Sequence, residues 1–199
     1  CAKVDSSHGI SYMAMSHFLL SLGFLSNWIG MMEFNLMLEN RYDKFLATVK
    51  EQNAGKDWYD IRKKMSAVPA LKKAILTFMA EDEYEETRKL IDERIKTYDA
   101  TKLKEDLRLY LEHYPEKKIV FFIDEMSEAL SQKKINLLDL EGLSEALSSL
   151  GNRVWTVGIA QQAFNDVLNA SGLNIHQLNK VEARFKTRIP IAAEEIDTI

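Results

Sequence analysis

Residues 119–123 form a short, wholly apolar run, Ile-Val-Phe-Phe-Ile, which ends abruptly at two adjacent carboxylates, Asp124 and Glu125. Its β-branched and aromatic side chains are typical of a strand buried on both faces, as in the parallel sheets of α/β proteins. In open α/β sheets, ligands bind just outside the carboxyl ends of the strands, where these carboxylates lie. The run therefore predicts an α/β fold with an acidic site at one sheet edge. A strand that simply runs into an acidic turn would look the same, and this segment alone does not separate the two.

A second buried strand is predicted over residues 153–159, after a leucine stripe that is typical of a helix. Asp139 is a candidate N-cap for this helix, and Gly151 is a candidate C-terminal stop. A strand, a single helix and a strand form a βαβ unit, so parallel pairing is expected. Gln161 follows the second strand and should emerge at the same sheet edge as Asp124. Its amide could hydrogen-bond a γ-phosphate or an attacking water, or it could cap the next helix.

Two arginines follow in the segment Arg-Phe-Lys-Thr-Arg-Ile-Pro-Ile, where Arg184 closes a predicted helix and Arg188 begins a short strand. Guanidinium groups bind phosphate oxygens bidentately, which makes both residues candidates for contact with a nucleotide. The alternative for Arg184 is a basic helix end that complements the helix dipole. Pro190 cannot donate to a ladder, so the short strand is expected at a sheet edge.

Residues 6–32 contain no charged side chain, which raises the question of a membrane span. The stretch is interrupted by serines, histidines and glycines, and its apolar residues follow helical spacing. We therefore expect a buried core helix over about 11–25 rather than a span.

Residues 27–114 are expected to be almost entirely helical, with breaks between helices near Gly55 and Pro69. The strongly charged stretch 81–104 is typical of a solvated helix face. Two ion pairs at the favourable i,i+4 spacing are expected there: Glu85–Lys89 and Asp92–Lys96.

The length of 199 residues suits one large domain, or one domain with an insertion. The net charge of −4 indicates no overall attraction to nucleic acid or anionic lipid, although it leaves room for a local basic patch. The single cysteine, Cys1, suits a reducing cytoplasm. The chain does not begin with Met, and its last residues resemble the first turns of a helix. We expect an excised fragment of a longer, cytoplasmic protein.

The order of these elements resembles the second half of a P-loop ATPase core of the AAA+/STAND kind. The resemblance is strongest to the large P-loop ATPase of bacterial BREX phage-defence systems and its relatives, and it covers roughly residues 1–25 and 117–199. It implies a partial P-loop NTPase-like parallel sheet flanked by helices. Residues 1–26 would follow a missing P-loop, 27–114 would be a large all-helical insertion, and 115–199 would complete the core and begin the lid.

The resemblance also implies roles for individual residues. Asp124 resembles the Walker B aspartate that binds Mg²⁺ through water, and Glu125 resembles the catalytic glutamate. Gln161 is similar to a sensor-1 residue. Arg184 resembles an arginine finger or sensor arginine, with Arg188 as a second candidate. The expected cofactors of the full-length protein are ATP and Mg²⁺. Its expected partners are further copies of itself or other defence-system proteins, with nucleic acid involved only indirectly and no membrane.

The sequence departs from this family in one respect, because it contains no Walker A motif. The P-loop requires Gly-x-x-x-x-Gly-Lys-Ser/Thr, and the only Gly-Lys pair here is Gly55-Lys56, with Lys50 and Asp57 at the flanking motif positions. We therefore expect this chain alone to lack ATPase activity and to hold neither ATP nor Mg²⁺.

Two other functions are compatible with the same residues. The first is a non-catalytic helical interaction module on an α/β base. The second is a hydrolase that uses Asp124 and Glu125 as an acid–base pair, but consecutive strand residues point to opposite faces, and no third partner is evident. The four histidines show no metal-ligand spacing.

Overall fold

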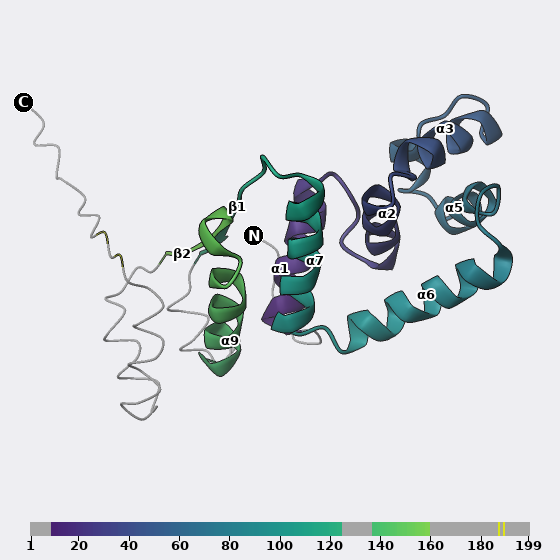
Figure 1. Cartoon of the computed structure of the whole chain (residues 1–199). Coiled ribbons are helices and arrows are strands. Elements are labelled where there is room, and N and C mark those ends of the chain that lie inside the picture. The colour runs from purple at the N-terminus through teal and green to yellow at the C-terminus, as the bar shows by residue number, and fades with distance from the viewer. Residues whose placement is uncertain (1–8, 125–136, 160–186, 188, 190–199) are drawn as a thin grey trace, which may run out of the picture.

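The computed structural model describes residues 9–124, 137–159, 187 and 189, and it shows a largely helical chain with one small parallel sheet (Figure 1). Helices and strands are both present, so the α/β prediction is confirmed at this coarse level. The elements are α1 (Ile10–Ser21), α2 (Trp28–Leu38), α3 (Tyr42–Gln52), α4 (Trp58–Ile61), α5 (Ala67–Ile75), α6 (Glu81–Lys96), α7 (Ala100–His113), β1 (Ile119–Ile123), α9 (Leu137–Ser148), the 3₁₀ turn η1 (Gly151–Arg153) and β2 (Val154–Gly158).

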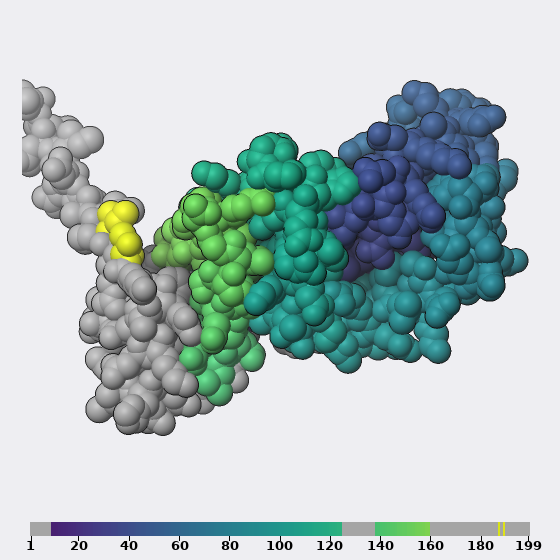
Figure 2. Space-filling view, viewed as in Figure 1, coloured from purple at the N-terminus to yellow at the C-terminus, as the bar shows by residue number. Residues whose placement is uncertain are grey.

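The helices form a block that continues from the sheet to a distant end made by α3 and α5. Helices α1 and α7 lie side by side and contact α9, while α6 passes α2 on its way from α5 back to α7 (Figure 1). Figure 2 shows these elements in continuous contact from α9 to α5. The block predicted for residues 27–114 is therefore helical, and it shares one hydrophobic core with α1, α9 and the sheet.

That core is built from apolar faces that meet at helical spacing. Its largest fully buried side chains include Trp58, Phe34 and Phe45 in the helical block, together with Met15 and Leu19 of α1. Buried aromatic rings meet edge to face, as in the pair Phe45–Trp58 with ring centroids 5.2 Å apart. Within the described residues, no helix is long and apolar enough to cross a membrane.

Helix α1 ends at Ser21, four residues before the end expected from the sequence. Gly23 adopts a left-handed backbone with φ of 83°, and the N–H groups of Gly23 and Phe24 bond back to the carbonyls of Leu20 and Leu19 at 3.0 and 2.9 Å. This pattern is a Schellman motif, which glycine favours because it carries no Cβ. The apolar residues beyond it still pack on the core, but from a loop.

Helices α2 and α3 end in a similar left-handed turn, but with residues other than glycine in the left-handed position. Asn40 and Ala54 take the left-handed position, with φ of 57° and 54°. The N–H of Arg41 bonds to the Leu36 carbonyl at 2.8 Å, and that of Gly55 bonds to the Lys50 carbonyl at 2.9 Å. Both helices therefore reverse within two residues, which brings α3, α4 and α5 close together.

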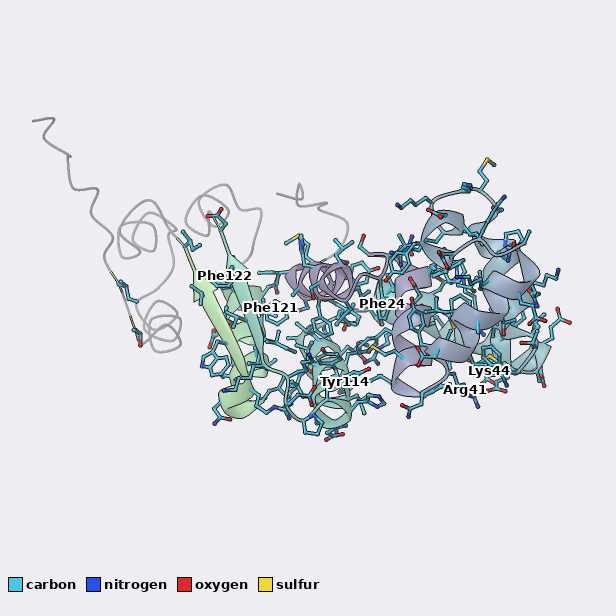
Figure 3. All side chains as sticks on the ribbon, turned by 90° about the horizontal axis from the view of Figure 1, so that it is seen from above. Phe24, Arg41, Lys44, Tyr114, Phe121 and Phe122 are labelled. Atoms are coloured by element: carbon cyan, nitrogen blue, oxygen red, sulfur yellow. The ribbon has the colours of Figure 1, made fainter. Side chains whose placement is uncertain are left out.

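Strands β1 and β2 pair in parallel, in the register Ile119↔Val154 to Ile123↔Gly158, as the βαβ pattern predicts. Only one face of the pair is buried, so the expectation of a strand buried on both faces is corrected. Phe121 lies on the side that faces α1 and packs on the core, whereas Phe122 lies on the opposite side and is 68% exposed (Figure 3). The alternation follows from the two-residue period of a strand.

Three smaller expectations are also revised. Helix α9 begins at Leu137, so Asp139 lies in its first turn rather than at the N-cap, while Gly151 has the left-handed φ of 73° expected after the helix. In α6, Glu85 bonds to Lys72 of α5 at 2.7 Å, and Asp92 pairs with Arg88. Both acids thus have partners other than the predicted Lys89 and Lys96. Glu85 pairs with Lys72 because α5 brings that lysine against α6, whereas Asp92 pairs with a residue of its own helix.

Candidate functional site at the carboxyl end of β1

Asp124 is the first residue after β1, in an exposed turn at the carboxyl end of the strand. Strand β2 ends beside it, because Ile123 is paired with Gly158 and the N–H of Ile159 donates to the Ile123 carbonyl at 2.8 Å. The two strands therefore deliver their following residues to the same edge of the sheet. This is the edge at which open α/β sheets bind ligands.

The other predicted site residues lie outside the described residues. These are Glu125, Gln161, Arg184 and Arg188, so their positions and their grouping with Asp124 stay predictions. Gln161 follows Ile159 by two residues along the chain.

Arg153, the last residue of η1, lies directly before β2 at the opposite end of the sheet from Asp124. Its guanidinium donates to the carbonyls of Leu111 at 3.0 Å, Tyr114 at 2.7 Å and Lys117 at 2.9 Å. Two of these carbonyls belong to the last turn of α7 and its cap, which lack helical partners. Arg153 therefore joins the amino ends of both strands to the end of α7. Sequence reasoning did not identify this role, which depends on contacts 36 to 42 residues away.

A second polar cluster lies inside the helical block, around the fully buried carboxylate of Glu33. Its Oε1 accepts hydrogen bonds from Trp58 Nε1 at 2.8 Å, Tyr42 OH at 2.9 Å and Arg62 Nη1 at 3.1 Å. Its Oε2 accepts from the backbone N–H of Leu25 at 3.3 Å. A buried carboxylate is stable only when it is paired and hydrogen-bonded in this way.

The Glu33 cluster is suited to structure rather than catalysis, because its carboxylate already has four donors. Burial, followed by the neighbouring Glu33 charge, raises the pKa of Tyr42 well above its ordinary value, so this phenol stays a donor. The sequence did contain a signal for the cluster, since Glu33 is the only charged residue in α2. A single acid among apolar residues in a core helix indicates a buried partner.

A third cluster joins α6 to α7 through Asp106. Its Oδ2 accepts a 2.6 Å hydrogen bond from Tyr98 OH, and its Oδ1 accepts one of 2.8 Å from Arg94. Burial, followed by the Asp106 charge, raises the pKa of Tyr98. Both carboxylate oxygens are occupied, so this cluster is also structural.

The chemistry available at the sheet edge therefore depends on Asp124. An exposed carboxylate at the end of a parallel strand can accept hydrogen bonds from the water shell of Mg²⁺, which favours oxygen ligands. Among residues 9–124 and 137–159, no group of three His, Cys, Asp or Glu side chains could hold a metal ion directly.

No known protein family matches the chain, and no solved structure does either.

Proposed function

We propose that this chain is the second half of a P-loop ATPase core, of the AAA+/STAND kind found in BREX phage-defence ATPases. The observation that carries the proposal is the position of Asp124, at the carboxyl end of a strand paired in parallel with β2. That arrangement suits a Walker B strand beside a sensor strand.

The outward face of the sheet supports a larger α/β core. Four apolar side chains on that face are 38 to 68% exposed and pair across the strands: Val120 with Trp155, and Phe122 with Val157. Parallel strands occur almost only in sheets covered on both faces, and two strands alone are at best marginally stable. In our proposal, β1 and β2 are therefore members of a wider sheet.

In the proposed mechanism, each residue has a separate task. Asp124 would hold Mg²⁺ through water, Glu125 would orient or activate the attacking water, and Gln161 would contact the γ-phosphate without adding charge. Arg184, or alternatively Arg188, would neutralise charge that develops in the transition state. Mg²⁺, when bound with ATP, would supply charge compensation for the phosphoryl group. The phosphate-cradling loop has to come from outside these 199 residues, because their sequence contains no Walker A motif.

The proposal is tested by Asp124→Asn in a longer polypeptide that includes a phosphate-binding loop. We expect Mg²⁺-dependent ATP turnover to fall by about 10²-fold or more, because metal-bound charge stabilisation is worth several kcal/mol. Asp139→Asn, which changes an exposed carboxylate in the first turn of α9, is the matched control and should leave turnover unchanged. Equal turnover in both variants would exclude Asp124 from the mechanism.

The isolated chain offers a second test, because it is expected to bind Mg-ATP weakly or not at all. The competing function, a non-catalytic helical interaction module, is favoured by the wholly helical character of the elements α2–α7. The two differ in the longer polypeptide: the ATPase turns over ATP and loses turnover with Asp124→Asn, whereas the interaction module has no turnover to lose.

A further inference from the structure

The net negative charge of the chain conceals a basic region at one end of the helical block. Residues 41–75 carry nine Lys and Arg against four Asp and Glu, a formal charge of +5, while the whole chain carries −4. Helix α6, in contrast, has seven acidic and four basic residues. The positive charge comes from α5 and from the residues that flank and connect α3, α4 and α5, because α3 itself is neutral and α4 is negative. These elements lie at the end of the block far from β1 (Figure 1). Such segregation attracts anions locally even in an acidic chain.

A shallow pocket lies in this basic region, where the end of α3 meets the turn between α4 and α5. We call it the α3–α5 pocket, and its lining residues are Gln52, Asn53, Ala54, Lys56, Ile61, Lys64 and Ser66. The left-handed residues at the end of α3, Ala54 and Gly55, turn the chain so that Lys56 and Lys64 reach it from either side of α4. Two lysines therefore line one small pocket.

Lys56 and Lys64, unlike Lys50 and Lys72, have no carboxylate within ion-pair distance in the part of the chain that the structure describes. Nearby, Lys50 binds Asp57 at 3.2 Å, and Lys72 binds Glu81 and Glu85 at 3.0 and 2.7 Å. Lys56 and Lys64 are exposed and line the same pocket, and like charges that share a site repel. An anion between them would remove that repulsion.

Polar groups in the same pocket are also available. The Ser66 side chain makes no capping bond to α5, although the residue is at its N-cap. The Gln52 Oε1 atom is screened from solvent without a hydrogen-bond partner. A buried acceptor left unsatisfied in this way is destabilising. Because a side-chain amide can rotate to present either its oxygen or its NH₂, Gln52 can serve a ligand as acceptor or donor.

We propose that the α3–α5 pocket binds a phosphate group of a nucleic-acid backbone. The available cations are lysines, which act as point charges suited to phosphate, whereas planar carboxylates are better matched by arginine forks. The one arginine nearby, Arg62, is already used: it donates to Glu33 at 3.1 Å and to the Gly23 carbonyl at 2.6 Å. The net positive charge of residues 41–75 attracts a polyanion, which carries many negative charges, more strongly than it attracts a single free phosphate.

The test uses the 199-residue chain and a fluorescein-labelled single strand of about 20 nucleotides, longer than one binding site. Binding is followed by anisotropy between about 50 and 200 mM salt. We expect K56E/K64E to weaken binding by about tenfold or more, and K56Q/K64Q to lower the salt slope by about 2, one per lysine. The matched control is K89E/K117E, which changes the net charge equally at exposed lysines outside the pocket and should bind nearly as the parent does. Circular dichroism verifies that each variant is folded.

Three results would overturn the proposal. The first is no binding at the lowest salt. The second is an equal loss in K56E/K64E and K89E/K117E, which would indicate general charge rather than the pocket. The third is that inorganic phosphate or polyglutamate displaces the labelled oligonucleotide at a lower concentration, counted as negative charges, than unlabelled oligonucleotide does. That result would assign the pocket to a free anion or to an acidic protein segment instead.

Discussion

The indole N–H of Trp58 donates a 2.8 Å hydrogen bond to the carboxylate of Glu33, which lies 25 residues earlier in a different helix. Arg62 binds the same oxygen and continues to the carbonyl of Gly23. One buried acid thus joins the loop after α1 to α2 and α4. Because every donor in this cluster is directed at Glu33, the cluster depends on that residue's charge.

We predict that Glu33→Gln lowers the free energy of unfolding by about 3–5 kcal/mol, the usual effect of breaking a buried ion pair. The neutral amide leaves Arg62 without a counter-charge, and its NH₂ group replaces an acceptor. Urea denaturation measures the change. Glu39→Gln is the control, because its pair with Arg41 is about half exposed and should be worth less than about 1 kcal/mol. Equal effects of the two substitutions would contradict a structural role for the buried charge.

At Gly30, we expect the substitution by alanine to change stability in the direction opposite to that expected from helix propensity. Alanine normally stabilises a helix by up to about 1 kcal/mol relative to glycine. At Gly30, however, a Cβ would overlap the backbone carbonyl of Leu25, which cannot move without shifting the loop. We expect Gly30→Ala to destabilise the protein by at least about 1–3 kcal/mol, as overpacking does.

Gly142 of α9 is the matched control for this substitution. A Cβ there would meet no atom within 4 Å, so Gly142→Ala should stabilise the protein. Thermal denaturation of both variants decides between the two effects. A gain in melting temperature for Gly30→Ala would show that α2 does not rest against Leu25.

Asp99 makes stability depend on pH, because it is the N-cap of α7. Its Oδ1 accepts a 2.9 Å hydrogen bond from the backbone N–H of Lys102, and this bond lowers the pKa of Asp99 below the ordinary 3.8. A carboxyl with a lowered folded-state pKa stabilises the fold above pH 3.8. That contribution is lost as the pH falls through the lower, folded-state pKa.

We therefore expect Asp99→Ala to cost about 1 kcal/mol near pH 7 and less at low pH, so that its curve of stability against pH approaches that of the parent in acid. Denaturant titrations at several pH values measure this. Asp57→Ala is the control, since Asp57 also precedes a helix but makes no capping bond. A loss that is constant with pH would contradict the cap.

Part of the fold was predictable from sequence because its signals are local. The short apolar run before Asp124 has the composition of a buried strand, and the leucines before β2 recur at helical spacing. The parallel β1–β2 pair with α9 between them could therefore be predicted. Glycine signals were present as well, and the Schellman turn at Gly23 explains why α1 ends early. The exposed side chain of Phe122 was not predictable, because burial depends on what covers a sheet and not on the strand itself.

The polar clusters were not predicted because their partners are distant in sequence. Glu33 meets Trp58 and Arg62 only after α2, α3 and α4 have packed, and no spacing rule relates these positions. At the candidate site, only Asp124 lies within the described residues. The roles of Glu125, Gln161, Arg184 and Arg188 therefore stay predictions that rest on the order of motifs in the chain.

Arg153 provides the last prediction, because it connects the sheet that carries Asp124 to the helical block. Its planar guanidinium reaches three carbonyls, those of Leu111, Tyr114 and Lys117, and a lysine has neither the fork nor the spread to do so. We expect Arg153→Lys to lower stability by about 1–3 kcal/mol, since at least one carbonyl loses a charged donor. Hydrogen exchange should quicken in β1 and β2 while the protected amides of α2 and α3 stay unchanged, because the lost bonds lie on the sheet side.

Arg108→Lys is the control for this experiment, because the pair of Arg108 with Glu112 is exposed on the surface of α7 and should contribute under about 1 kcal/mol. If Arg153→Lys instead accelerates exchange equally in the sheet and in α2 and α3, the sheet and the helical block unfold as one unit. In that case Arg153 would stabilise the whole chain rather than hold the strand ends. A selective effect on β1 and β2 would identify Arg153 as the residue that positions the strand leading to Asp124.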